Sequence, residues 1–403
     1  MASKKKSGLF APVAGFRFAG MAAGIKKKAG APDLALIVAD DEVPVAAVFT
    51  TNRVKAAPVK LAAQRTKRGR ARAVIVNAGN ANACTGEAGM AAAKESTAAV
   101  ARALAIPAAS VIPASTGVIG VVLPAAKIVE AAPTLAERAS PDGVEDFAHA
   151  ILTTDRGPKL ARVAFSIGDR EATVLAIAKG AGMIHPNMAT TLGFVVTDAP
   201  VSSEALSAAL RRSTELTFNR ISVDGDTSTN DTIVALASGA VGGKPLAGKS
   251  LQAFEDALRE ALEGVALQIV ADGEGAEHVA RIVVSGARSD ASALRIARTM
   301  ATSPLVKTAM HGKDPNWGRL LAAAGRSGER FDPEKAEVRL GGVTVFRAGL
   351  TTMDVKVEAK AAAVMKRPRY DVDLVLQEGA GSAFYWTCDL GHDYVSCNAD
   401  YRS

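Results

Sequence analysis

Residues 179–194 read KGAGMIHPNMATTLGF and join two apolar runs with strand character, so a turn between two strands is expected here. Gly180 and Gly182 permit a sharp change of direction in that turn. A turn of this kind can hold one peptide bond under strain, and a side-chain hydroxyl beside that bond can attack the preceding carbonyl. Here the hydroxyl belongs to Thr190 and the carbonyl to Ala189. The stretch therefore indicates that Thr190 can cut its own chain.

A cut at this bond would give Thr190 a free α-amine. The ordinary pKa of such an amine is about 7.7 to 8.0, close enough to working pH for the amine to serve as base for the adjacent hydroxyl. Nucleophile and base would then belong to one residue. A threonine between an alanine and another threonine is also common in plain strands, so these residues by themselves leave an ordinary strand as the alternative.

Apolar runs typical of strands recur along the chain and indicate mixed sheets. Residues 163–177 are typical of a hairpin that turns at Gly168 and Asp169, and residues 371–390 of a second one that turns near Gly379. Antiparallel pairs mixed with helices predict an α+β fold, with layered mixed and antiparallel sheets and flanking helices. The further strand candidates are residues 34–38, 45–49, 73–76, 194–197, 232–236 and 282–284.

The clearest helix is expected after Ser250, which is placed to cap its first turn. Leu251, Phe254, Leu258, Leu262 and Val265 fall on one face of that helix. Other helices are expected at residues 88–104, 204–216 and 291–300. The tail from Glu334 onward is strand-rich, which predicts a smaller carboxy-terminal domain at residues 285–403.

The composition predicts a globular protein of more than one compact domain. The chain has 403 residues, of which 48% are hydrophobic and 22% charged. No apolar run approaches the roughly 20 residues needed to cross a bilayer. The basic start of the chain is followed by no clean signal-peptide core, which predicts a cytoplasmic location without a membrane partner.

The formal net charge of +7 raises the alternative of a nucleic-acid partner, mainly through the basic run at residues 65–72. Aromatic residues are only 4% of the chain, and none interleaves with that run to stack on bases. A solvated basic loop and no nucleic-acid partner are therefore expected. Cys84, Cys388 and Cys397 are an odd number of cysteines, which predicts free, buried thiols and neither a disulfide framework nor a four-ligand zinc site.

Residues 243–250 read GKPLAGKS and fit the P-loop pattern G-x-x-x-x-G-K-[ST], which makes a nucleotide enzyme the strongest rival from another class. This loop follows an apolar run and precedes the clear helix, as a phosphate cradle should. Residues 239–242, however, separate it from the preceding strand, and Asp272 comes directly after the same helix. A surface turn that caps a helix is the simpler interpretation.

Other catalytic patterns are weaker. The histidines show no metal-binding spacing such as H-E-x-x-H, so no metal site is predicted; they are His149, His185, His278, His311 and His392. No G-x-S-x-G nucleophile elbow is present, and Cys84 among asparagines and glycines is more typical of a small packed residue than of a nucleophile. His185 lies in the 179–194 turn and is expected to shape it.

A series of sequence blocks together resembles the ornithine acetyltransferase family, also called the bifunctional arginine-biosynthesis acetyltransferases. The likeness spans nearly the whole chain and includes the stretch at residues 179–194. The other blocks are FTTN at 49–52, VNAGNANACTG at 76–86, PASTGVIG at 113–120, TTD at 153–155, DGDTSTNDT at 224–232, DGEGA at 272–276, VKTAMHGKDPNWGR at 306–319 and NADYRS at the end. So many matching blocks in one order exclude chance agreement.

The resemblance implies cleavage between Ala189 and Thr190 into an α fragment, 1–189, and a β fragment, 190–403, that stay together, with paired αβ units forming a heterotetramer. It implies a fold of the self-cleaving N-terminal-nucleophile type and an enzyme that moves acetyl from N-acetylornithine to glutamate through an acetyl-Thr190 intermediate. No cofactor is implied, and acetyl-CoA stays open as a second acetyl donor. An amidase or aminopeptidase, in which water takes the acyl group, is the alternative within the same chemistry.

Carried over position by position, the resemblance makes Thr190 the nucleophile. Thr116 and Gly117 would form an oxyanion hole through a hydroxyl and a backbone N–H, which are suitable donors. Lys179 suits the carboxylate of the substrates, and Glu274 suits their ammonium end or a proton relay. The substrate-binding positions implied by the resemblance are Thr153, Lys179, Thr190, Glu274, Asn398 and Ser403.

Two positions depart from the family pattern. Thr191 stands where the family has methionine, and its second hydroxyl offers an alternative cutting point one residue later. Small Ala189 and the family register favour Thr190. Lys313 stands where relatives more usually have an acidic residue, which leaves ligand contacts around Asn316 open.

Overall fold

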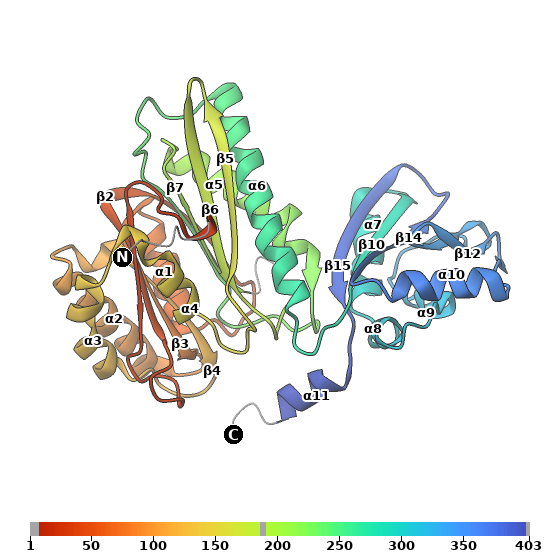
Figure 1. Ribbon diagram of the computed structural model, residues 1–403, viewed down its shortest axis with the longest axis horizontal. Helices are drawn as coiled ribbons and strands as arrows, with labels where there is room; N and C mark the ends of the chain where they lie inside the picture. Colours follow the sequence, from red (N-terminus) through yellow and green to blue (C-terminus); the bar gives the residue numbers. More distant parts are fainter. Residues whose placement is uncertain (1–7, 186–190, 400–403) are drawn as a thin grey trace, which may run out of the picture. The chain divides into compact units, whose positions relative to one another are not determined.

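The structure, a computed structural model, describes residues 8–185 and 191–399 (Figure 1). The chain forms two compact units. Unit 1 comprises Met1–Gly180, Pro186–Asn219 and Thr227–Ala266, and unit 2 comprises Ala181–His185, Arg220–Asp226 and Leu267–Ser403. Unit 2 thus takes in more of the chain than the domain expected at 285–403, because strand β10, Val279–Ala287, runs across that boundary.

Within the described residues, unit 1 contains one sheet of eight strands. The strand order is β4-β3-β2-β9-β7-β6-β5, and β1 pairs with β2 beside this path. The strands are β1 Phe16–Met21, β2 Leu34–Phe49, β3 Arg70–Asn80, β4 Val111–Val118, β5 Lys159–Ile167, β6 Arg170–Lys179, β7 Leu192–Thr197 and β9 Thr232–Ala237. Parallel and antiparallel pairs both occur, so the expected mixed sheet is confirmed.

The long strand β2 is shared between two halves of this sheet. Its first part pairs with β3 and its last part, residues 45–49, pairs with β9, with a break in register between Val38 and Val43. Buried apolar side chains from both halves form one core. Phe147 of helix α4 (Val144–Ala150) lies in that core, edge-on to Phe18 on one half and to Phe194 on the other. Apolar burial between the two halves therefore holds unit 1 together.

Helices cover the outer faces of the two halves. Leu34, Leu36 and Val38 pack with helices α2 (Gly86–Ala103) and α3 (Ala125–Glu137), which lie side by side in Figure 1. On the other half, α5 (Ser203–Leu216) contacts β2 and β9, and Phe254 of α6 (Gly248–Ala271) packs on Phe165 of β5. Helix α1, Ala57–Thr66, contacts β4 and α2.

Unit 2 has a second mixed sheet, of seven strands among the residues described, in the order β13-β12-β11-β14-β10-β15-β8. One face is covered by helices, and Ile282, Leu374, Tyr385 and Met300 belong to the core between them. The remaining elements are β8 Ile221–Ser222, β11 Glu337–Leu340, β12 Val343–Arg347, β13 Leu350–Thr351, β14 Arg369–Val375, β15 Gly381–Cys388, α7 Asp290–Ala301, α8 Pro304–His311, α9 Trp317–Gly325, α10 Val355–Met365 and α11 His392–Ala399. Short 3-10 turns lie at Gly8–Phe10, Ala108–Ser110, Pro141–Gly143, Phe218–Arg220 and Pro333–Lys335.

One of the two expected hairpins is confirmed. Strands β5 and β6 pair antiparallel around the turn at Gly168 and Asp169. The hairpin expected at 371–390 is wrong, because β10 lies between β14 and β15, parallel to one and antiparallel to the other. The apolar pattern of each strand is satisfied in either arrangement, so the pattern could not choose the neighbour.

Three smaller expectations are corrected. Helix α6 begins at Gly248, so Ser250 lies inside its first turn instead of capping it. The basic run at residues 65–72 is exposed at Lys67, Arg68 and Arg70, as expected of a solvated run, but it covers the end of α1, a turn and the start of β3 instead of a loop. All three cysteines are free as expected, but Cys388 alone among them is buried.

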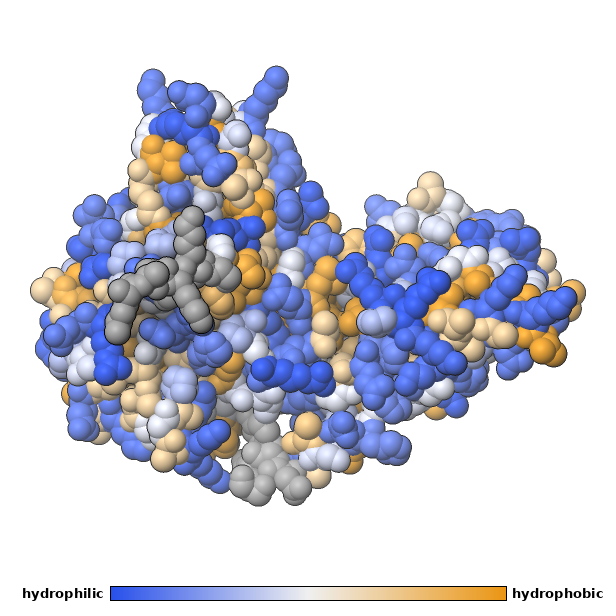
Figure 2. All heavy atoms as spheres, viewed as in Figure 1, coloured by the Kyte–Doolittle hydropathy of each residue, from blue (hydrophilic) through white to orange (hydrophobic). Residues whose placement is uncertain are grey.

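Figure 2 shows mainly hydrophilic side chains on the face in view of each unit. In the part of the chain that the structure describes, no helix is long and apolar enough to cross a membrane.

Candidate functional site

Two of the predicted site residues at the processing turn, Ala189 and Thr190, lie outside the described residues, and so does Ser403. Thr191, the residue directly after Thr190, is buried. The carbonyl of Thr191 accepts a hydrogen bond from the backbone N–H of Thr232 at 2.9 Å, and its hydroxyl donates to the carbonyl of Lys179. The residue after the predicted nucleophile is thus held between β6 and β9 by both its backbone and its side chain.

Lys179 ends β6 directly opposite Leu192 of β7. Its side chain is nine-tenths buried, and its Nζ lies 2.6 Å from the hydroxyl oxygen of Thr153 and 3.5 Å from that of Thr116. Three of the predicted site residues from three separate parts of the sequence therefore meet beside the first residues of β7.

Asp155 sets the charge balance of this group. Its carboxylate accepts hydrogen bonds from Lys159 Nζ at 2.7 Å and from the backbone N–H of Gly180 at 2.6 Å, and its other oxygen lies 3.6 Å from Lys179 Nζ. Burial alone would raise the pKa of this carboxyl, but Lys179 and Lys159 outweigh burial and hold the pKa well below its usual range. The ionised carboxylate in turn fixes the ammonium of Lys179 beside Thr153.

Gly117 has a backbone conformation that only glycine tolerates at this place. Its φ is 131°, and a Cβ would come within 2.3 Å of the carbonyl carbon of Gly79 on β3. The pairing between β3 and β4 is irregular at this point, where Asn80 faces both Thr116 and Val118. A bulge of this type re-aims the backbone, as is common beside active sites.

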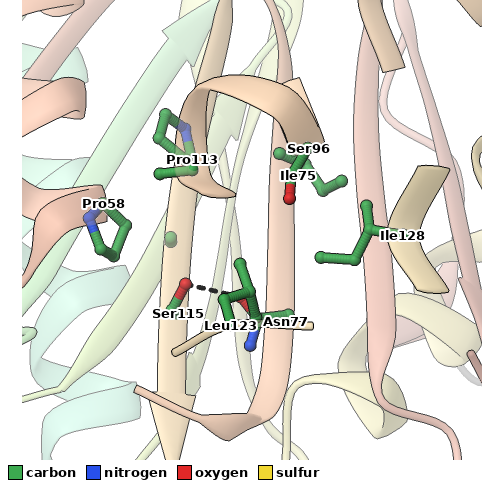
Figure 3. Close-up of a pocket in the computed structure, with 10 residues that line it drawn as sticks. Pro58, Ile75, Asn77, Ser96, Pro113, Ser115, Leu123 and Ile128 are labelled. Atoms are coloured by element: carbon green, nitrogen blue, oxygen red, sulfur yellow. Dashed lines mark hydrogen bonds between the residues drawn. The ribbon is translucent and has the colours of Figure 1, made fainter. Parts of the chain in front are cut away.

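A buried amide network supports the bulge from the other side of β4. Ser115 donates its hydroxyl to Asn77 Oδ1 at 2.6 Å, and Asn230 Nδ2 donates to the carbonyl of Ser115 at 2.9 Å. Figure 3 shows Ser115 and Asn77 together in a small pocket whose other walls are mostly apolar, among them Ile75, Leu123 and Ile128. Because successive side chains on a strand alternate in direction, this pocket lies on the opposite face from Thr116.

Asp231 is a fully buried carboxyl just before β9. Thr50 and Ser228 provide hydrogen bonds, yet its Oδ2 atom has no hydrogen-bond partner among the described residues. Burial raises the pKa of this carboxyl well above its ordinary value, against the smaller opposing effects of those hydrogen bonds and of Lys179. The neutral form of Asp231 is therefore favoured. Asp231 directly precedes Thr232, which pairs with Leu192 of β7.

The remaining predicted residues are in unit 2. Asn398 on α11 donates its side-chain amide to Glu274 Oε2 at 2.7 Å. Glu274 follows α6 in a glycine-flanked loop, and its own backbone N–H donates to the carbonyl of Ala181 at 2.9 Å. A Cβ at Gly182 would come within 2.4 Å of the Glu274 carboxylate, so the backbone before the processing site passes directly over that group.

Residues 243–250, the P-loop alternative, form a mostly exposed loop that leads into α6. A phosphate cradle needs backbone N–H groups free to face the ligand. The N–H of Leu246 donates to Pro200, and the N–H groups of Val241 and Gly242 just before the loop donate to Asp198 and Gly239. Arg170 binds the carbonyls of Val241 and Gly242. The backbone is thus anchored at Leu246 and just before the loop, at Val241 and Gly242.

The block around Asn316 has structural contacts of its own. Asn316 caps α9 by accepting from the backbone N–H of Arg319 at 3.1 Å, and Lys313 lies 3.3 Å from Glu277. Within the described ranges, no group of three His, Cys, Asp or Glu side chains is arranged to hold a metal ion.

Sequence reasoning did not single out Asp155, Lys159 or Asp231. Asp155 lies in the TTD block and four residues before Lys159, a spacing at which opposite charges can pair. Asp231 lies in the DGDTSTNDT block. In both cases the only feature of the sequence that could have indicated a site was an acidic residue shortly before an apolar strand.

Comparison with known proteins decides the family. Residues 17–403 match the sequence profile described as the ArgJ family. The chain belongs to the ArgJ family. It is 49% identical over 390 residues to the arginine biosynthesis bifunctional protein ArgJ of Nitratidesulfovibrio vulgaris, covering 96% of this chain and 98% of that protein. The ArgJ protein of Geobacter sulfurreducens is 47% identical over 393 residues, covering 97% and 100%.

A solved structure is also similar. The crystal structure of arginine biosynthesis bifunctional protein ArgJ from Bacillus halodurans is 39% identical, covers 51% of this chain and 97% of that chain, and has a TM-score of 0.49. Membership of the ArgJ family confirms the resemblance found in the motif blocks. The chain is accordingly an enzyme of the ornithine acetyltransferase type, with an acetyltransferase role in arginine biosynthesis.

Proposed function

We propose that this member of the ArgJ family cuts itself between Ala189 and Thr190 and then moves acetyl from N-acetylornithine to glutamate through an acetyl-Thr190 intermediate. The observation that carries the proposal is the position of Lys179, opposite Leu192 and hydrogen bonded to Thr153, with the Thr116 hydroxyl at 3.5 Å. A cation and two hydroxyls thus gather beside the strand that begins two residues after Thr190.

In the cutting step, the Thr190 hydroxyl oxygen adds to the carbonyl carbon of Ala189. The C–N bond breaks as the hydroxyl proton passes to the nitrogen, which leaves an ester. Water then hydrolyses the ester, releasing the carboxylate of Ala189 and restoring the hydroxyl. The product is a β chain, 190–403, whose first residue carries both a hydroxyl and a free α-amine.

In the transfer steps, the α-amine takes the hydroxyl proton while the oxygen attacks the acetyl carbonyl of N-acetylornithine. The Thr116 hydroxyl and the Gly117 backbone N–H stabilise the oxyanion, and ornithine leaves with the proton. The amine of glutamate then attacks acetyl-Thr190 and regenerates the enzyme. Both substrates carry a carboxylate, for which Lys179 offers a positive charge. Glu274, held by Asn398, offers a negative charge for the ammonium of ornithine.

Thr190 is favoured over Thr191 as the nucleophile. The Thr191 hydroxyl is buried and already donates to the Lys179 carbonyl, so attack by its oxygen would require that hydrogen bond to break.

The decisive experiment is mass spectrometry of the purified protein. Wild type should give two fragments of nearly equal size, the second beginning at Thr190, whereas Thr190→Ala should stay whole. Incubation with N-acetylornithine alone should add one acetyl group to the β fragment. A single intact wild-type chain with full activity would refute the mechanism.

Steady-state kinetics separate the proposal from its rivals. Parallel lines in double-reciprocal plots are expected, because one hydroxyl holds the acetyl group between the two substrates. Intersecting lines would contradict the acetyl-Thr190 intermediate, and ATP binding together with lost activity in Lys249→Ala would favour the P-loop alternative. Acetate release without glutamate at the full transfer rate would favour an amidase. Glutamate acetylation with acetyl-CoA as the sole donor tests the second acetyl source.

A further inference from the structure

Residues 181–185 are the last described residues before the proposed cut, and the contacts that anchor them come from unit 2. The Asp224 carboxylate accepts from two successive backbone N–H groups, those of Met183 at 2.5 Å and Ile184 at 2.9 Å. Met183 has a φ of 56°, a left-handed conformation that costs energy for a residue with a long side chain. The paired hydrogen bonds to Asp224 hold it there.

His185 is anchored by a second group of contacts. Its Nε2 faces Arg298 of α7, with Arg298 Nε at 2.9 Å and Nη2 at 2.5 Å. Because a guanidinium has only donors, Nε2 must be the acceptor, and the ring proton must lie on Nδ1. Nδ1 lies 3.2 Å from Ser222 Oγ, which itself donates to the carbonyl of Ile184. Burial and the charge of Arg298 lower the pKa of His185 to about 4, so the ring is neutral at working pH.

We infer that Arg298 and Asp224 are positioning residues for the self-cleavage reaction, acting by holding residues 181–185 in the one conformation from which the bond before Thr190 is cut. This inference rests on the proposed self-cleavage. Neither residue is part of the transfer machinery described above. The reason is geometric: attack by a hydroxyl on a neighbouring carbonyl needs a narrow set of backbone conformations, and a fixed segment shortly before the bond removes many of the competing ones.

The same contacts have a consequence after the cut. Residues 181–185 would then belong to the α fragment, whereas Asp224, Ser222 and Arg298 would belong to the β fragment. Glu274 of the β fragment also donates its N–H to Ala181. The anchor would therefore hold Gly182, in the last described part of the α fragment, against the Glu274 carboxylate, where there is no room for a side chain.

The experiment follows cleavage of the full chain over time after a labelled pulse of cell-free synthesis. Arg298→Ala should slow cleavage by about 10- to 100-fold, the range that small misplacements cost. Arg298→Lys, which keeps one donor, should recover part of the rate, and so should added guanidinium with Arg298→Ala. The matched control is Arg295→Ala, one turn earlier on α7, where the arginine pairs with Glu329 at the surface. This control should cleave at the wild-type rate.

Two further variants keep the test decisive if Arg298→Ala folds poorly. Asp224→Asn puts an amide N–H₂ against a backbone N–H and should also slow cleavage. His185→Gln keeps an acceptor for Arg298 and should cleave faster than His185→Leu. Cleavage of Arg298→Ala and Asp224→Asn within a factor of about two of wild type, far less than misplacement costs, would overturn the inference. Equal slowing by Arg295→Ala would also overturn it, since the effect would then be one of α7 stability. An uncut wild type would refute the proposed function itself.

Discussion

Lys179 Nζ lies 2.6 Å from Thr153 Oγ1, and the Asp155 carboxylate two residues after Thr153 lies 3.6 Å from the same nitrogen. The lysine is thus held by a hydroxyl and a buried carboxylate from one loop. That carboxylate also pairs with Lys159, so its single negative charge does not fully neutralise Lys179. The remaining positive charge can attract a substrate carboxylate.

Lys179→Met should raise the KM for N-acetylornithine and glutamate by about 10- to 100-fold, the value of a hydrogen bond to a charged group. Asp155 should stay ionised through Lys159, so the folded state should persist. Lys28→Met, at an exposed lysine, is the control and should leave KM unchanged. An unchanged KM in Lys179→Met would separate this lysine from carboxylate binding.

Thr116→Ala should lower turnover by about 100- to 1,000-fold with little change in KM, as is typical when one oxyanion donor is removed. Thr116→Ser, which keeps the hydroxyl, should retain most of the turnover. The measurement uses protein that has already been cleaved, because slower cleavage would otherwise be mistaken for slower transfer. Turnover of Thr116→Ala close to wild type would make Thr116 an ordinary strand residue.

Thr191→Val should still be cut, and its second fragment should still begin at Thr190. The substitution removes only the hydrogen bond to the Lys179 carbonyl, at a cost in stability of about 1 kcal/mol. Mass spectrometry of the fragments and thermal unfolding measure the two effects. A Thr191→Val chain that stays whole while Thr190→Ala is cut would move the nucleophile to Thr191.

Asp231→Asn should flatten the dependence of unfolding temperature on pH. The folded-state pKa of Asp231 is raised by burial, so its contribution to stability is complete below the unfolded pKa of about 3.9 and is lost as pH rises through the folded-state value. The neutral amide has no such titration. The measurement is the unfolding temperature of two uncut proteins, Thr190→Ala with and without Asp231→Asn. As pH rises, the unfolding temperature of the protein that keeps Asp231 should fall relative to that of the Asp231→Asn protein. Parallel curves would mean that the acid is ionised throughout.

Local pattern predicted part of the fold, chiefly the central strands and the helices α2, α5, α6 and α7. The alternation in β5 and β6 and the glycine at their turn predicted that hairpin, because both strands and the turn are neighbours in sequence. The site was predicted only through the family resemblance: Lys179 and Glu274 have no local feature that separates them from solvated loop residues. The structure places Lys179 beside Thr153 and Thr116, and Glu274 beside Asn398.

The sequence by itself determined the family, through blocks along nearly the whole chain, and the candidate nucleophile, through the residues around Thr190. Tertiary structure alone decided that β10 separates β14 from β15, that Asp155 pairs with both Lys159 and Lys179, and that Arg298 holds His185. The physical reason is that burial and charge select these partners, some of which lie more than a hundred residues apart in the sequence. An apolar pattern or a single charged residue is compatible with many partners until the core has formed.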